Sequence, residues 1–277
     1  MIFAELEHTR LRVEAYGRAG YMVLAIPGWL EPLEAYLPLA QSLVQIDAPV
    51  RTYLVDLPGT GRSERRTARG YAVTDFADDL WELVDALHCE SIILMGHSMG
   101  GVIACVMALR RPKQTAGLIL IDTQPGGACP DIWPPSLSQS LKLKAALDRL
   151  PEAAFPRMLP RLVFQGLVEH QVDHELWPVM RPLIAATPPD AAREALASVL
   201  EVNLQPQLEQ ITAPTLDVLG ALDPVMMPAE HDLLLRLPNC SRREIPAAGH
   251  VVLLDAPYDL AQVIADFLAG LSASAAA

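Results

Sequence analysis

Ser98 stands at the centre of Gly96-His97-Ser98-Met99-Gly100, the stretch of this 277-residue chain best suited to covalent chemistry. Four apolar residues, 92–95, precede it, and an apolar segment that ends before Arg110-Arg111-Pro112 follows it. This order predicts a short strand, a sharp turn and a helix. Glycines on both sides of the turn permit a strained backbone that raises the serine hydroxyl above the carboxyl end of the strand. Ser98 is therefore the candidate nucleophile.

A serine hydroxyl reacts only with a base within hydrogen-bond reach and a third group that orients that base. Asp223 follows a predicted strand at 214–219, and His250 follows another near 242–245. Because the carboxyl ends of parallel strands meet at one edge of a sheet, both side chains are expected beside Ser98. The chain order, with serine first, then aspartate, then histidine, fits this arrangement.

The chain resembles the α/β-hydrolase fold superfamily, specifically its carboxylesterase-like serine hydrolases with a helical cap, over nearly all of its length outside the cap. Four motifs carry the resemblance: Gly-His-Ser-Met-Gly around Ser98, Asp-Leu-Pro-Gly-Thr-Gly-Arg-Ser from Asp56, Gly-Ala-Leu-Asp-Pro from Gly220 and Gly-His-Val-Val-Leu-Leu-Asp-Ala-Pro from Gly249. The resemblance implies a mostly parallel eight-stranded sheet flanked by helices. It also implies that Ser98 is the nucleophile, His250 the general base and later acid, and Asp223 the orienting acid.

The same resemblance implies an oxyanion hole formed by the backbone N–H groups of Trp29 and Met99. Gly28, Trp29, Leu30 and His97 are the expected substrate contacts, although the tight turn is expected to aim His97 away from Ser98 and favours a structural role for it. The chain departs from the family pattern at Pro27, where members usually carry histidine, and at Thr60, where they carry an aromatic residue or histidine.

The sequence contains other ionisable residues that could take part in catalysis or in substrate binding. Asp122 ends a predicted strand at 117–121 and is the alternative acid, whereas Asp217 lies inside a strand and is expected to pair with a neighbour. Histidines without a partner motif are expected on the surface or in packing: His8, His88 and His231. Arginines of the helical insertion are expected to be solvated rather than to bind a substrate carboxylate: Arg157, Arg161 and Arg181.

The elements that must position these residues alternate between strand and helix, which predicts an α/β fold with a parallel sheet. An antiparallel hairpin is expected at 1–8 and 10–16. Further strands are expected at 21–26, 50–55, 92–95, 117–121, 214–219 and 242–245. Helices are expected from about Pro38, from Thr74, after Ser98, at about 228–237 and at about 257–268, with 272–277 as a loose tail.

Between about 126 and 206 the sequence shows only helical patterns and prolines. This break predicts a helical cap at 128–205, inserted between a first core part at 1–127 and a second at 206–277. The cap is expected to cover the triad with apolar side chains such as Leu143, Leu147, Phe155 or Leu159, because an insertion after the strand at 117–121 emerges at the carboxyl edge of the sheet.

Composition narrows the possible partners. A net charge of −12 without a basic run argues against nucleic acid and anionic membrane surfaces, and no apolar run reaches membrane-spanning length. The first residues lack the basic and long apolar regions of a secretion signal, so the cytoplasm is the expected location. Cys89, Cys105, Cys129 and Cys240 have no zinc or redox spacing, and His170 and His174 lack the glutamate of a zinc protease. No metal and no cofactor is therefore predicted.

The predicted function is hydrolysis of a carboxylic ester, lactone or thioester of a small apolar molecule through an acyl-enzyme on Ser98. Three alternatives stay open. The same fold could support a cofactor-free oxygenase, which Pro27-Gly28-Trp29 resembles, or a hydrolase of carbon–carbon bonds. The protein could also be a small-molecule receptor that keeps the triad but does not convert its ligand.

Overall fold

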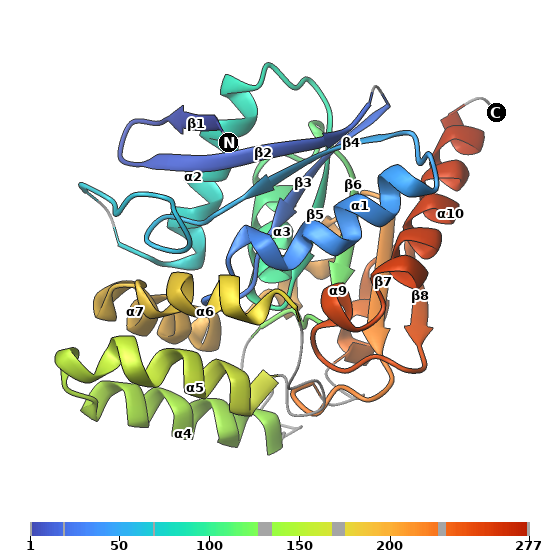
Figure 1. Cartoon of the computed structure of the whole chain (residues 1–277). Helices are drawn as coiled ribbons and strands as arrows, with labels where there is room; N and C mark the ends of the chain where they lie inside the picture. The colour runs from blue at the N-terminus through green and yellow to red at the C-terminus, as the bar shows by residue number, and fades with distance from the viewer. Residues whose placement is uncertain are drawn as a thin grey trace.

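A single sheet runs through the protein, with strands in the order β1-β2-β4-β3-β5-β6-β7-β8. The computed structural model describes residues 2–18, 20–68, 70–126, 135–167, 175–226 and 231–275 (Figure 1). The strands are β1 (Ile2–Glu5), β2 (Arg10–Gly17), β3 (Tyr21–Ile26), β4 (Val50–Val55), β5 (Ile92–His97), β6 (Thr115–Ile121), β7 (Thr215–Gly220) and β8 (Cys240–Ile245). The β1–β2 and β2–β4 pairs are antiparallel, and every other pair is parallel. The predicted eight-stranded, mostly parallel sheet is confirmed.

The central strands are apolar runs because helices cover both of their faces. Alternate residues of β5 divide between the two sides: Ile92 and Leu94 join one core cluster, and Ile93 and Met95 join the other. Helices α2 (Val73–Ala86) and α3 (Met99–Arg110) pack on the first side, and α1 (Leu37–Gln45) and α10 (Pro257–Ala275) on the second (Figure 1). Because successive side chains of a strand point to opposite faces of the sheet, one apolar strand contributes to both hydrophobic cores.

The segment between β6 and β7 contains helices α4 (Pro135–Arg149), α5 (Phe155–Leu167), α6 (Trp177–Ala185) and α7 (Pro189–Glu201). These helices lie at the end of the sheet toward which the β7 and β8 arrows point (Figure 1). Hydrogen bonds attach α7 to segments that precede the insertion: the Trp29 indole N–H donates to the Ala192 carbonyl at 2.8 Å, and the Val73 N–H to Ser198 Oγ at 2.9 Å. The described helices between β6 and β7 therefore lie at the carboxyl edge of the sheet.

Two predicted elements differ from the structure. The helix expected at 228–237 falls partly outside the described residues, and what is described there is a 3₁₀ segment, η4 (Asp232–Arg236), which ends before Pro238. The tail expected from Ser272 is instead helical, since α10 continues to Ala275. Alanine favours helix, and Ser272 Oγ lies 2.9 Å from the Tyr21 hydroxyl. The rest of the chain end is outside the described residues.

Among the described residues, Cys89, Cys105 and Cys240 carry free thiols, whereas Cys129, His170 and His174 lie outside them. Short helical elements complete the fold: η1 (Leu33–Tyr36), η2 (Glu152–Ala154), η3 (Gln205–Gln210) and α9 (Val252–Asp255). None of the described helices combines the length and apolar character needed to cross a lipid bilayer.

Candidate active site

The turn at Ser98 is as tight as its glycines predict. Ser98 sits between the last residue of β5 and the first of α3 with φ 50° and ψ −119°, a conformation that L-residues rarely adopt. A Cβ on Gly96 would lie 2.2 Å from the Gly100 carbonyl oxygen, and one on Gly100 would lie 2.0 Å from that of Ile26. Only glycine fits at either position. The surrounding sheet holds the strain, because the Ser98 N–H donates to the Ile121 carbonyl at 2.9 Å.

Ser98, His250 and Asp223 form one hydrogen-bonded chain. His250 Nε2 lies 3.2 Å from Ser98 Oγ, and His250 Nδ1 lies 2.8 Å from Asp223 Oδ2. The three residues follow β5, β8 and β7, so the carboxyl edge of the sheet brings them together across 152 residues of sequence. The distance from Ser98 Oγ to His250 is within the reach of a general base.

Asp223 is held as an anion. Its Oδ1 accepts hydrogen bonds from the N–H groups of Val225 at 2.6 Å and Met226 at 3.1 Å. Burial opposes ionisation, but His250 and these backbone donors outweigh it and hold the pKa of Asp223 below its usual value. A carboxylate in this state fixes the His250 proton on Nδ1 and leaves Nε2 free to accept the serine proton.

Asp122, the alternative acid, faces a different set of partners. Its Oδ1 accepts the Gly220 N–H at 2.8 Å, whereas the His250 ring hydrogen-bonds to Asp223. Burial, followed by the nearby Asp223 charge, raises the pKa of Asp122 well above its usual value. Asp217 does pair with a neighbour, as predicted, since Arg242 Nε donates to its Oδ2 at 2.8 Å.

His97 lies behind the base rather than at the nucleophile. Its Nδ1 is 3.0 Å from Glu31 Oε2, and its Nε2 is 2.7 Å from the carbonyl oxygen of His250. Burial disfavours a charge here, but Glu31 overcomes it and raises the pKa of His97 to about 9. Both ring nitrogens therefore have protein partners, which supports the structural role and leaves neither for the substrate contact that was also expected.

The loop of residues 27–31, called the oxyanion loop below, was predicted to hold part of an oxyanion hole. Its Gly28 N–H donates to Glu31 Oε2 at 2.6 Å, so this donor is committed within the protein. In contrast, the backbone N–H groups of Trp29 and Met99 donate no hydrogen bond to any of the described residues. Leu30 takes a left-handed φ of 61° and is buried. Sequence reasoning missed Glu31, although a carboxylate in an otherwise apolar loop was a usable sign.

A buried ion cluster holds the segment that directly follows this loop, at Leu33 and Glu34. Arg12 Nη1 donates to Glu34 at 2.7 Å, and Asp56 Oδ1 accepts the Leu33 N–H at 2.7 Å. Asp56 Oδ2 accepts the Arg62 N–H at 2.9 Å, so one carboxylate joins the loop after β4 to the segment after β3. The motif beginning at Asp56 therefore has a structural function here.

The structure also shows how buried the other residues named in the sequence analysis are. Leu147, Phe155 and Leu159 of the insertion are fully buried, and Leu143 is partly buried against the same cluster. Arg157, Arg161 and Arg181 are exposed, as expected for solvated side chains. His231 is not a surface residue: only 1% of it is exposed, beside Asp122 and Asp223.

Comparison with known proteins gives relatives of similar length. The pimeloyl-(acyl-carrier protein) methyl ester esterase of Aeromonas salmonicida (strain A449) is 28% identical over 264 residues, which cover 92% of this chain and 98% of that protein. The sn-1-specific diacylglycerol lipase ABHD11 of Mus musculus is 26% identical over 234 residues, covering 83% of this chain and 75% of that protein.

The fold is also found among solved structures. The enol-lactonase from Burkholderia xenovorans LB400 superposes with a TM-score of 0.77 over 97% of this chain and 100% of that one, at 19% identity. A sequence profile of the alpha/beta hydrolase fold matches residues 21–257. Sheet order, the turn at Ser98 and this match lead to one conclusion: the chain belongs to the α/β-hydrolase fold family.

Proposed function

We propose that the protein is a serine hydrolase that cleaves a carboxylic ester, lactone or thioester of a small apolar molecule through an acyl-enzyme on Ser98. The observation that carries this proposal is the continuous chain from Ser98 Oγ to His250 at 3.2 Å and from His250 to Asp223 at 2.8 Å. These are the contacts that turn a weak hydroxyl into a nucleophile.

In the first half of the reaction, Ser98 Oγ attacks the acyl carbon while its proton passes to His250 Nε2. Asp223 stabilises the imidazolium that forms, and His250 then gives this proton to the departing alcohol or thiol. In the second half, His250 takes a proton from water, the hydroxide attacks the acyl carbon, and the proton returns to Ser98. The acid is released, and no cofactor is needed in this scheme.

The negative charge that develops on the acyl oxygen needs donors that are already in position. We assign this role to the backbone N–H groups of Trp29 and Met99, which flank Ser98 from the oxyanion loop and from the start of α3. The Glu31 carboxylate, which accepts the Gly28 N–H at 2.6 Å, supports the loop in this conformation. Pro27 replaces the usual histidine, and we propose that Glu31 and His97 take over its task of shaping the loop.

We divide the chain into a hydrolase core at 1–127 and 206–277 and a helical cap at 128–205. The apolar stripes of the cap helices support our proposal of an apolar acyl or alcohol group; Phe155 and Leu159 themselves are packed into the hydrophobic core. The names of the relatives, a methyl ester esterase and a diacylglycerol lipase, support an ester as substrate. Free thiols at Cys89, Cys105 and Cys240 suit a reducing compartment, and we place the protein in the cytoplasm.

The test combines a panel of 4-nitrophenyl and alkyl esters, lactones and thioesters with mass spectrometry of the intact protein and an oxygen electrode. Hydrolysis with an acyl adduct on Ser98 and no oxygen uptake supports the proposal. Oxygen consumption without an adduct would favour the cofactor-free oxygenase, and tight binding without any turnover would favour the receptor. The Ser98→Ala variant is the control, because it removes the nucleophile and retains the fold.

A further inference from the structure

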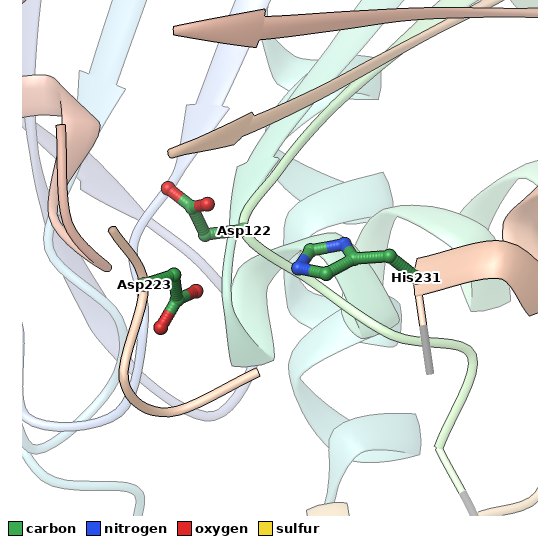
Figure 2. A group of neighbouring side chains, drawn as sticks. All are labelled: Asp122, Asp223 and His231. Atoms are coloured by element: carbon green, nitrogen blue, oxygen red, sulfur yellow. The ribbon is translucent and has the colours of Figure 1, made fainter. Parts of the chain in front are cut away.

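Asp122, Asp223 and His231 form a buried cluster next to the candidate site (Figure 2). Asp122 follows β6, Asp223 follows β7, and His231 directly precedes η4, so three separate segments contribute. One ligand atom from each residue lies within 4.8 Å of the other two. Figure 2 shows the His231 ring reaching toward the two carboxyl groups from the opposite side. The proposed hydrolysis uses Asp223 but neither of the other two.

Part of this cluster is buried without a hydrogen-bond partner. Asp122 is 0% exposed and His231 is 1% exposed. Asp122 Oδ2 and both ring nitrogens of His231 make no hydrogen bond of normal geometry with the described residues, although the Val252 N–H lies close enough to Asp122 to favour its ionised form. A buried polar atom without a hydrogen-bond partner is unfavourable, so an imidazole with two such nitrogens points to a ligand at this position.

We propose that Asp122, Asp223 and His231 bind a divalent transition-metal cation, with zinc as the best match. Imidazole and carboxylate are ligands that zinc prefers, and two carboxylates balance its charge. Zinc bonds of about 2.0–2.2 Å place tetrahedral ligands roughly 3.4 Å apart. The three ligand atoms, which now lie within 4.8 Å of one another, would have to move closer together to reach this spacing. Asp122 Oδ2 and the His231 ring nitrogens are free to do so, whereas Asp223 would share with the cation a carboxylate that already accepts hydrogen bonds from Val225, Met226 and His250.

The charges around the cluster suit a cation. Metals bind the neutral form of imidazole and the ionised form of carboxylate. Two aspartates beside one histidine can therefore supply the negative charge that a divalent cation needs. Two basic groups outside the proposed triad act on the cluster, and each is paired with acidic side chains of its own: Arg242 with Asp217 at 2.8 Å and Asp232 at 2.6 Å, and His97 with Glu31 at 3.0 Å.

The backbone of His231 is also fixed in place. The Arg242 guanidinium donates to its carbonyl oxygen, which ties the start of η4 to strand β8. Asp122 Oδ1 is held by the Gly220 N–H, which leaves Oδ2 as the unbonded oxygen. Ligands positioned in this way lose little freedom when a cation binds.

Cation binding has a consequence for turnover, and this part rests on the proposed function. Asp223 lies 2.8 Å from His250 Nδ1 and stabilises the imidazolium during acyl transfer. A cation that shares the Asp223 carboxylate draws negative charge away from His250. Zinc would then lower kcat without competing for the space in front of Ser98, so KM should not change.

The experiment titrates zinc chloride into the chelator-treated full-length protein in competition with a chromophoric chelator. The wild type should bind one zinc ion per chain. His231→Asn and Asp122→Asn should each weaken binding by about tenfold or more. The second of these variants keeps the oxygen that accepts the Gly220 N–H. His88→Asn is the matched control, because His88 is exposed and its φ of 53° is one that asparagine tolerates. Its zinc affinity should equal that of the wild type.

Circular dichroism confirms that each variant is folded, so that a loss of binding is attributable to the missing ligand. Absence of stoichiometric binding to the wild type, or equal zinc affinity of the wild type and His231→Asn, would overturn the assignment. Turnover of 4-nitrophenyl butyrate provides a second readout, in which zinc should inhibit the wild type and His88→Asn but not His231→Asn. Zinc binding that depends on His231 in a protein without ester turnover would support the cation site and reject the proposed function.

Discussion

Glu31 and His97 form a buried ion pair that joins two loops of the candidate site. Glu31 Oε2 lies 3.0 Å from His97 Nδ1 and also accepts the Gly28 N–H at 2.6 Å. On its other side, the His97 Nε2–H donates to the carbonyl oxygen of His250 at 2.7 Å. One carboxylate thus connects the oxyanion loop, through His97, to the backbone of the candidate base.

This pair makes stability depend on pH in a defined window. The pKa of His97 is raised from 6.5 to about 9, so its stabilising contribution is complete below pH 6.5 and is lost as the pH rises toward 9. A shift of this size corresponds to a contribution on the order of 3 kcal/mol. In Glu31→Gln the decline between pH 6.5 and 9 should largely disappear. Urea unfolding of the wild type and of Glu31→Gln at several pH values measures how the free energy of unfolding changes with pH.

Glu34→Gln is the matched control, because it removes a nearby buried carboxylate whose partner, Arg12, remains charged throughout this window. It should lower the free energy of unfolding by a similar amount at every pH. If Glu31→Gln showed the same pH dependence as the wild type, His97 would not be the titrating group.

Ser98→Ala and His250→Ala should each lower ester turnover by about a millionfold, because members of a triad act as a unit. A fluorophosphonate probe should label Ser98 and no other serine. Ser42→Ala is a suitable control, since Ser42 Oγ bonds only to the Pro38 carbonyl within α1. Full esterase activity in Ser98→Ala would reject the hydrolase mechanism.

The sequence predicted the sheet well because its strands are apolar runs bounded by glycine, proline or charge. Strands β3 and β4 begin and end where the pattern places them, and β5 and β6 do so within two residues. Ser98 and Asp223 were found in the same way, since each follows such a run. The strand before His250, Cys240–Ile245, is largely polar, and His250 was found from its Gly-His motif instead. The end of α10 was missed because a run of alanine and serine has little apolar periodicity, although alanine favours helix.

Contacts between distant segments could not be predicted. The Glu31–His97 pair spans 66 residues of sequence and has no motif, so it depends on how the oxyanion loop folds over β5. His231 has no partner motif and was expected on the surface or in packing; the fold buries it beside Asp122 and Asp223. The spacing of apolar residues indicates which face of a helix or strand is buried. It does not indicate which side chain of another element will lie against that face.

Asp223→Asn should leave the fold intact and lower turnover by about ten-thousandfold, because asparagine would favour the wrong His250 tautomer. Asp122→Asn should have a much smaller effect, since burial already favours the neutral form of Asp122 and asparagine can still accept the Gly220 N–H. Steady-state kinetics on one activated ester measure both variants. A larger loss in Asp122→Asn than in Asp223→Asn would assign the acid to the end of β6.

The indole of Trp29 donates to the Ala192 carbonyl at 2.8 Å, so the side chain connects the oxyanion loop to α7 of the insertion. Its backbone N–H, the proposed oxyanion donor, is present whatever the side chain. Removal of a whole oxyanion donor costs roughly 3 to 4 kcal/mol, whereas loss of one hydrogen bond between neutral groups costs about 0.5–1.5 kcal/mol. Trp29→Phe should therefore change kcat for short activated esters by less than about tenfold.

The larger effect of Trp29→Phe should be on substrate preference, because α7 loses its bond to the loop that would lie against the acyl group in the proposed mechanism. We expect the ratio of kcat/KM values for long and short acyl esters to change in Trp29→Phe. In Trp81→Phe, which removes the equivalent bond from the Trp81 indole to the Met107 carbonyl at 3.1 Å inside the core, stability should fall and this ratio should not change. A loss of kcat of about a hundredfold or more in Trp29→Phe, with an unaltered ratio, would show that the indole supports the chemistry itself rather than the position of α7.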